Sequence, residues 1–188
     1  MEIIKGGVCA AKGFYAAGVE AGIKYQNRKD MALVYSEAPC VCAGTFTSNV
    51  VKAAPVLWDK AVVENSPYVQ AVVVNSGIAN ACTGKEGMEC CEKTAQAAAE
   101  ALAVPKDSVL IGSTGVIGMQ MPIDRLTAGV RMLAAEKAHS EHAAQMAAEA
   151  IMTTDTRDKQ EAVRFTVGGR TVTMGGMSKG SGMIHPNM

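Results

Sequence analysis

One segment of the chain combines glycines with small hydroxyl side chains in a way that suits anion or oxyanion binding. It reads Gly112-Ser-Thr-Gly-Val-Ile-Gly118 and directly follows a short apolar run. The glycines recur at every third position, which is not the spacing of a dinucleotide loop, and the lysine of a P-loop is absent. Two interpretations stay open. The segment is a tight turn that needs glycine dihedral angles, or it is an anion hole in which the Thr114 hydroxyl and the Gly115 N–H donate to a developing oxyanion.

Two further segments place donors where they could meet a ligand. Thr153-Thr-Asp-Thr156 follows a long predicted helix. Clusters of hydroxyls and Asp commonly end helices by competing for backbone groups, and a hydroxyl there can also donate to a ligand. Lys179 is followed by Gly-Ser-Gly, a flexible backbone that can approach a ligand closely. The lysine is therefore either a solvated surface charge or a partner for a substrate carboxylate.

The composition excludes several other classes of protein. The 188 residues are 48% hydrophobic, which is enough for a sizeable core, and 18 basic residues balance 18 acidic ones. No basic face is available for a phosphate backbone, so nucleic acid is not an expected partner. The amino terminus lacks the features of a secretory signal, and no apolar run reaches the length of a membrane span. We therefore expect a cytoplasmic protein that has no contact with a membrane and keeps its cysteines reduced.

The cysteines and histidines do not form a recognisable metal motif. Cys40-Val-Cys42 and Cys90-Cys91 lack the gap of zinc knuckles, and the three histidines lie far from them in the sequence. Cys91 falls on the apolar stripe of a predicted helix, where a free thiol behaves as a small hydrophobe. No metal site is predicted.

Apolar periodicity predicts strands and helices that alternate along the chain. Buried strands are expected at 31–35, 71–74 and 109–112, with a weaker candidate at 40–47. Helices are expected at 88–102, ended before Pro105, and at 124–152. Segments 162–167 and 170–174 flank Gly168-Gly169 and predict a hairpin. The pattern indicates a single domain of mixed α/β (α+β) class, with helices layered on β-sheets.

Several of these segments resemble motifs of the ornithine acetyltransferase (glutamate N-acetyltransferase) family, in the same order along the chain. The matches are Asn75-Ser-Gly-Ile-Ala-Asn-Ala-Cys-Thr-Gly84, the Ser-Thr-Gly-Val-Ile-Gly118 run, Thr153-Thr-Asp-Thr156 and Lys179-Gly-Ser-Gly-Met-Ile-His-Pro-Asn-Met188. Residues 10–18 match as well, so the resemblance covers nearly the whole chain. Ile78 replaces a usual Asn, which weakens any polar role at that position. His185 fills a variable position of the motif and receives no catalytic role.

The resemblance implies a self-processing acyltransferase with a fold like that of N-terminal-nucleophile enzymes. Residues 1–188 would be the alpha chain, with cleavage just after Met188 and the nucleophilic Thr at the start of the beta chain that follows. Thr114 and Gly115 would form the oxyanion hole, and Thr153 and Lys179 would bind substrate. The family transfers acetyl from N-acetylornithine to glutamate through an acetyl-threonine, uses no metal or organic cofactor, and forms a heterotetramer of two alpha and two beta chains.

Three alternatives remain at the level of the sequence. Bifunctional members of the family also use acetyl-CoA as a donor. An N-terminal-nucleophile amidase or aminopeptidase would share self-processing and the anion hole but would send the acyl group to water. A non-enzymatic module would use the glycine-rich segments only to bind a small anion.

Overall fold

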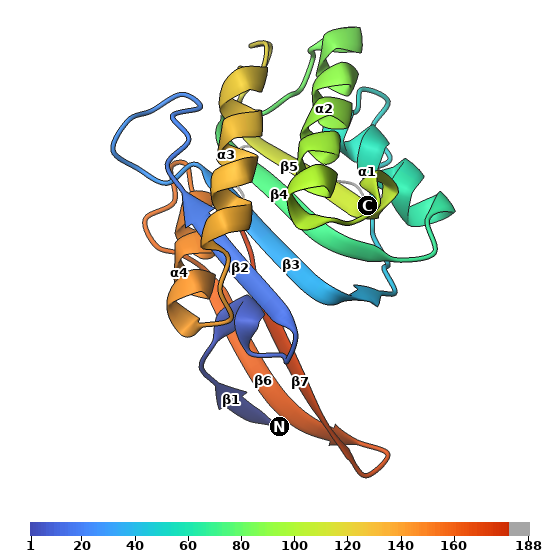
Figure 1. Cartoon of the computed structure of the whole chain (residues 1–188), viewed down its shortest axis with the longest axis vertical. Helices are drawn as coiled ribbons and strands as arrows, with labels where there is room; N and C mark the ends of the chain where they lie inside the picture. Colours follow the sequence, from blue (N-terminus) through green and yellow to red (C-terminus); the bar gives the residue numbers. More distant parts are fainter. Residues whose placement is uncertain (181–188) are drawn as a thin grey trace.

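The computed structural model describes residues 1–180, whose strands form two sheets flanked by helices (Figure 1). The first sheet has the strand order β2-β3-β4-β5, and the second has the order β1-β6-β7. The strands are β1 (Glu2–Ile4), β2 (Phe14–Val19), β3 (Met31–Cys40), β4 (Val69–Ile78), β5 (Val109–Val116), β6 (Gln160–Val167) and β7 (Arg170–Met177). The helices are α1 (Ala54–Asn65), α2 (Gly84–Leu102), α3 (Ile123–Glu136) and α4 (Glu141–Ala150), with short 3-10 turns η1 (Gly7–Cys9) and η2 (Lys106–Ser108). The expected mixed α/β class with helices layered on sheets is confirmed.

The four-stranded sheet separates two cores, because successive side chains of a strand point to opposite faces. Ala17 of β2 packs into the core that contains the buried faces of α2 and α3. Its neighbour Ala16 packs into a second core, which is built around the alanines of α4. Gly18 lets α4 approach closely, since a Cβ at that position would lie 2.0 Å from the carbonyl oxygen of Met146. Odd-numbered residues of β2, β4 and β5 therefore face α2 and α3, and even-numbered residues face α4. The end of β4 departs from this alternation, since Ile78, after Gly77 with a φ of +106°, packs into the core of α2 and α3.

The single helix predicted over 124–152 is wrong, because the chain changes faces of the sheet within it. Ala138 pairs with Ala16 at the outer edge of β2 through two backbone hydrogen bonds of 3.0 Å. Ser140 then begins α4 as its N-cap, and its hydroxyl accepts from the N–H of Ala143 at 3.1 Å. A continuous helix could not cover both faces, so the break at 137–140 is required by the two-core arrangement.

The other edge of the sheet, β5, is covered by side chains of α1. Trp58 donates from Nε1 to the carbonyl oxygen of Val109 at 2.9 Å, and the N–H of Ile111 donates to Asp59 Oδ1 at 2.8 Å. Burial raises the pKa of Asp59 to about 7, although the Ile111 N–H acts in the opposite direction. These bonds satisfy the outward-facing carbonyl of Val109 and N–H of Ile111, which would otherwise remain open to another chain.

The second sheet consists of the predicted hairpin and the short N-terminal strand. Val167 and Arg170 close the hairpin, and Gly168 and Gly169 between them both have positive φ, as a two-residue primed turn requires. The hairpin packs on η1, where Gly175 has no room for a Cβ beside the carbonyl of Gly7. The hairpin prediction is confirmed.

The remaining predictions of secondary structure have mixed outcomes. The strands predicted at 31–35, 71–74 and 109–112 and the helix at 88–102 are confirmed within β3, β4, β5 and α2. The strand candidate at 40–47 is wrong, because β3 ends at Cys40, opposite the first residue of β4, Val69, and residues 41–47 form no strand. Among residues 1–180, no helix is long and apolar enough to cross a membrane.

Candidate functional site

Thr114 and Gly115 lie at the C-terminal end of β5 and not in a loop. The glycine-rich loop predicted after a strand ending at 112 begins later than expected, since β5 continues to pair with β4 up to the Ile78 and Val116 partners and only residues 117 and 118 of the segment lie beyond the strand. Thr114 is opposite Ser76 in this parallel register. Its even-numbered position places its side chain on the α4 face of the sheet. Thr114 is half-buried and Gly115 is exposed, so a ligand at this strand end can reach both.

The strand geometry directs the Gly115 N–H toward the open edge of the sheet. Val109 and Ile111 present backbone groups to α1 on that edge, whereas the carbonyl of Val116 accepts from Ala79 on the β4 side. Gly115 has the same parity as Val109 and Ile111, so its N–H points away from β4. Gly115 lies four residues past Ile111, whose N–H donates to Asp59 of α1. The Gly115 N–H is therefore directed outward at a point past that contact.

Gly115 also needs to be glycine for steric reasons. Its φ is +136°, and a Cβ there would lie 2.2 Å from the carbonyl carbon of Gly77 in β4. The two backbones thus approach each other more closely than any side chain permits. The turn interpretation of the segment and the anion-hole interpretation are both compatible with this packing.

The strand end is tied to the C-terminal end of α4, where Thr153 follows. Ser76, which is 2% exposed, donates from Oγ to the carbonyl oxygen of Ala150 at 2.8 Å. Arg28 donates from Nη2 to the carbonyl of Met152 at 2.7 Å, which fixes the residue before Thr153. Since Ser76 is the register partner of Thr114, the segment 153–156 lies on the same face of the sheet as the Thr114 side chain.

The loop that carries Arg28 is held in place by Asp30. Asp30 is fully buried and accepts from the N–H groups of Ala21 and Ile23 at 2.7 and 2.6 Å. Burial raises the pKa of this carboxyl, while the two N–H donors lower it. Its own carbonyl accepts from the N–H of Ser76 at 2.8 Å, so the loop is attached to the same strand end. Sequence reasoning did not single out Arg28, Asp30 or this role of Ser76.

Thr153 and Lys179 are brought together by a residue that sequence reasoning also missed, Asp155. Oδ2 of Asp155 accepts from the N–H of Thr153 at 3.1 Å and from Lys179 Nζ at 3.0 Å. Oδ1 accepts from Lys159 Nζ at 3.1 Å and from the N–H of Gly180 at 2.7 Å. We call these five residues the Asp155 cluster. The sequence did contain a signal for this bond. Asp155 stands two residues after Thr153 at the end of a helix, where an Asp side chain often accepts from a nearby backbone N–H.

The Asp155 cluster keeps its central carboxylate ionised. Burial alone would raise the pKa of Asp155, whose side chain is only 3% exposed. The hydrogen bonds from the Thr153 N–H, the two lysine ammonium groups and the Gly180 N–H outweigh burial and hold its pKa below the usual range. Lys159 and Lys179 pair with different oxygens of this carboxylate, and the Lys179 side chain is 26% exposed, so its ammonium group is open to an anionic ligand.

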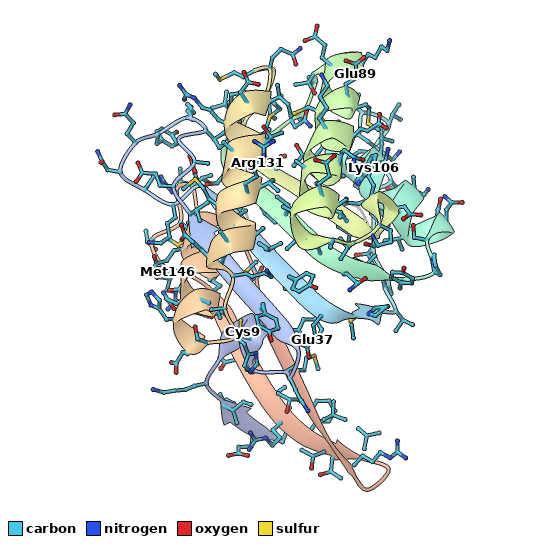
Figure 2. All side chains as sticks on the ribbon, in the orientation of Figure 1. Cys9, Glu37, Glu89, Lys106, Arg131 and Met146 are labelled. Carbon is cyan, nitrogen blue, oxygen red and sulfur yellow. The ribbon has the colours of Figure 1, made fainter. Side chains whose placement is uncertain are left out.

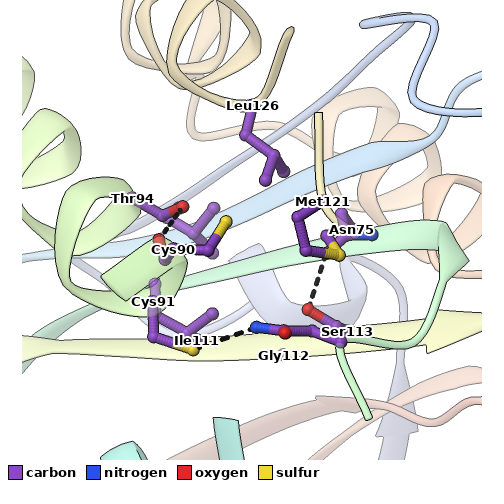
Figure 3. A pocket seen from close by; sticks show the side chains of 11 residues that line it. Asn75, Cys90, Cys91, Thr94, Ile111, Gly112, Ser113, Met121 and Leu126 are labelled. Atoms are coloured by element: carbon purple, nitrogen blue, oxygen red, sulfur yellow. Dashed lines mark hydrogen bonds between the residues drawn. The ribbon is translucent and has the colours of Figure 1, made fainter. Parts of the chain in front are cut away.

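The asparagines of the segment 75–84 have structural partners inside the fold. Ser113 donates to Asn75 Oδ1 at 2.6 Å, and Asn75 donates to the carbonyl of Ile78 at 2.9 Å. Asn80 has a positive φ of 47° and donates to the carbonyl of Gly87. The adjacent cavity, shown in Figure 3, has a volume of about 10 Å³, roughly that of one water probe. It is too small for a substrate, so these side chains shape the turn, as their residue types suggest.

A larger groove between α2 and α3 lies on the wrong face to serve this site. Its lining carries mixed charges and includes Glu89, Lys106 and Arg131, which are labelled in Figure 2. Lys106 is already paired with Glu92 at 2.7 Å. Thr114 points to the opposite face of the sheet, so the groove and the strand end are separate. Within residues 1–180 no three potential metal ligands come together.

The structure therefore places the predicted site residues in two connected groups, Thr114 with Gly115 and Thr153 with Lys179. Their functional roles remain predictions. The cleavage point after Met188 and His185 lie outside the described residues.

Solved chains with the same fold define the class of this protein. The structure superposes with a TM-score of 0.92 on arginine biosynthesis bifunctional protein ArgJ from Bacillus halodurans, at 42% identity over 99% of this chain and 97% of that chain. It is equally similar to ornithine acetyltransferase from Mycobacterium tuberculosis in complex with ornithine, with a TM-score of 0.91, 44% identity and coverage of 99% and 98%. The chain thus has the fold of an arginine-biosynthesis acetyltransferase.

The sequence places the chain in a particular family. The ArgJ family model matches residues 15–188, and the chain belongs to that family. It is 53% identical to the bifunctional ArgJ protein of Symbiobacterium thermophilum over 190 residues, which cover all of this chain and 46% of that relative. The chain thus spans about half the length of the curated relatives that it matches.

Proposed function

We propose that this chain is the alpha chain of an ornithine acetyltransferase that moves acetyl from N-acetylornithine to glutamate. One observation carries the proposal. The Thr114 hydroxyl and the outward N–H of Gly115 are adjacent at one strand end. Ser76 on the neighbouring strand bonds the carbonyl of Ala150 at the end of α4, three residues before Thr153 of the Asp155 cluster. An oxyanion donor pair together with the partly exposed Lys179 ammonium suits an acylated amino acid, which has both a reacting carbonyl and a carboxylate.

The proposed reaction proceeds in two balanced acyl transfers. A threonine at the start of the following chain attacks the acetyl carbonyl of N-acetylornithine, and its own α-amine takes the hydroxyl proton. Thr114 and Gly115 donate to the tetrahedral oxyanion, after which the C–N bond breaks and the proton passes to the departing ornithine amine. Glutamate then attacks the acetyl-threonine through its amine, and the same donors hold the second oxyanion. Lys179 and Thr153 bind the substrate in both halves.

The organisation of the protein is part of the proposal. The 46% coverage of the S. thermophilum relative supports a partner encoded by the remainder of a precursor cleaved after Met188. We expect two copies of each chain in a heterotetramer in the cytoplasm, with no metal or organic cofactor. As an alternative within this proposal, the enzyme also accepts acetyl-CoA as an acetyl donor, in line with the bifunctional name of that relative.

Labelled acetyl transfer tests the function. The full precursor is expressed, the processed enzyme is purified, and N-acetylornithine labelled in the acetyl group is added with and without glutamate. We expect labelled N-acetylglutamate and parallel double-reciprocal plots, the signature of ping-pong transfer. Release of labelled acetate independent of glutamate would instead identify an amidase. No turnover of either kind would favour an anion-binding module.

A further inference from the structure

The side chain that organises the Asp155 cluster has no role in the proposed chemistry so far. Its four donors come from three separate parts of the chain: the turn after α4, the residue just before β6 and the segment after β7. Without the carboxylate, nothing in these bonds would bring Lys179 and Thr153 together. The carboxylate is therefore the common support of the two predicted substrate-binding residues.

We propose that Asp155 is a positioning residue that aims the Lys179 ammonium at the carboxylate of the substrate. The inference rests on the proposed function, because Lys179 needs aiming only if it binds an amino-acid substrate. Asp155 does not contact the ligand in this proposal. It determines substrate specificity through Lys179, which it orients.

The number of donors on Lys179 supports this assignment. An ammonium group has three N–H donors. One bonds Asp155 Oδ2 at 3.0 Å and a second bonds the carbonyl of Gly180 at 3.3 Å. Within residues 1–180 these are the only two partners of the ammonium group, which leaves one N–H donor for a ligand. The side chain is 26% exposed, so a ligand can reach it. A flexible lysine loses side-chain entropy when it is fixed in one geometry, and Asp155 fixes it before the substrate arrives.

Lys159 distinguishes positioning from a general electrostatic effect. It pairs with the other oxygen of the same carboxylate at 3.1 Å, and its side chain is more exposed, at 41%. It also bonds the carbonyl of Arg157. If the net charge of the cluster alone attracted the substrate, removal of either lysine would have the same effect. If Asp155 aims Lys179, only the loss of Lys179 weakens binding strongly.

A purely structural role of Asp155 makes a different prediction from positioning. As an acceptor for the Thr153 N–H, Asp155 also stabilises the turn after α4. Asp155→Asn retains the size of the side chain and one carbonyl oxygen for such a bond, but it removes the ion pair with Lys179. A structural effect of this change would be independent of the residue at position 179, whereas a positioning effect would vanish when Lys179 is absent.

A double-mutant cycle on the purified, processed enzyme tests the inference. The variants are Asp155→Asn, Lys179→Met, the double variant and the matched control Lys159→Met. For Asp155→Asn we expect KM for N-acetylornithine to rise about tenfold with kcat changed less than about threefold, as for loss of an aimed charge-assisted bond. The double variant should match Lys179→Met within about twofold, and Lys159→Met should stay within about twofold of the unmodified enzyme.

Each contrary outcome has a defined meaning. Independent, multiplicative effects in the double variant, an unchanged KM in Asp155→Asn, or a Lys159→Met variant as weak as Lys179→Met would each overturn the inference.

If Asp155→Asn does not yield processed enzyme, Asp155→Glu takes its place. It retains the charge, so a KM within about threefold of the unmodified enzyme supports positioning, and a loss of tenfold or more contradicts it. Absence of acetyl transfer in the unmodified enzyme would overturn the proposed function itself, and it is seen without any variant.

Discussion

The two halves of the candidate site are positioned by different forces. Thr114 and Gly115 are held by the backbone, through the parallel register with β4 and a contact with Gly77 that admits no Cβ. Thr153 and Lys179 are held by a single carboxylate through hydrogen bonds and ion pairs. The first half should therefore respond to changes in shape and the second to changes in charge. This division suits a donor pair that must match a transition state and a charge that selects a substrate.

The largest effect is expected from Gly115→Ala. The new methyl group would meet the backbone of Gly77 at 2.2 Å, and alanine disfavours a φ of +136°. Overpacking and backbone strain together should cost about 3 kcal/mol or more. Thermal unfolding measures this cost. Gly118→Ala is the matched control, since Gly118 also has a positive φ of 82° but no atom of residues 1–180 within 4 Å of the position of its Cβ, and it should cost only about 1 kcal/mol. Equal costs for the two variants would contradict the close strand contact.

Thr114→Ala should have the largest effect on catalysis in an intact fold. Loss of one oxyanion donor is expected to lower kcat about 100-fold with little change in KM, because the bond forms only as charge develops. Steady-state kinetics on material already cleaved measures the change, and thermal melting confirms the fold. Thr127→Ala is a suitable control, since Thr127 is an exposed hydroxyl on α3 that bonds within its own helix. A turnover near that of the unmodified enzyme would return residues 112–118 to a structural role.

Salt should separate the two halves of the site without any mutation. Raising the ionic strength from about 0.01 to about 1 M shortens the screening length from about 30 to about 3 Å. We expect KM for N-acetylornithine to rise about threefold because Lys179 is partly exposed, while kcat stays nearly constant. In Lys179→Met, KM should hardly depend on salt. A salt effect of the same size in that variant would assign the attraction to other charges.

The smallest effect is expected at Asp59, which supports the strand that leads to Thr114. Its pKa is raised to about 7 by burial, from a usual value of 3.8. Between these two pH values the unfolded chain has lost the proton and the folded chain retains it, so stability falls as pH rises from about 4 to about 7. Asp59→Asn keeps an acceptor for the Ile111 N–H and removes this dependence.

Melting curves at different pH values measure the Asp59 effect. The melting temperature of Asp59→Asn relative to the unmodified protein should be a few degrees higher at pH 8 than at pH 5. Glu64→Gln, an exposed carboxylate on the same helix that pairs with Lys60, serves as the control and should show no such change. A constant difference between the two proteins across this range would contradict a buried, protonated Asp59.

The local elements of the fold could be predicted from the sequence, but their connections could not. The apolar stripe from Met88 to Leu102 is enough to predict α2, and the Gly168-Gly169 turn is enough to predict the hairpin of β6 and β7. The break at 137–140 depends on which face of the sheet each helix covers, and alanine-rich periodicity continues across it. α1 was missed because it lies over the edge of the sheet and its apolar residues form no single stripe.

The candidate site shows the same division. Thr114, Gly115, Thr153 and Lys179 could be selected from local residue types and the family resemblance. The extension of β5 through Val116 required knowledge of its partner strand. The bonds of Asp155 to Lys179 and of Ser76 to Ala150 join residues 24 and 74 positions apart, so no local pattern reveals them.

The acylation step tests the central claim most directly, that this chain supplies the oxyanion donors for an acyl-enzyme on another chain. Processed enzyme is mixed with N-acetylornithine in the absence of glutamate, quenched at intervals, and both chains are weighed by intact mass spectrometry. We predict that one acetyl group appears on the downstream chain and none on this chain, and that Thr114→Ala slows its appearance about 100-fold. An adduct on this chain, or formation of the acetyl-enzyme at the same rate in Thr114→Ala, would contradict the account.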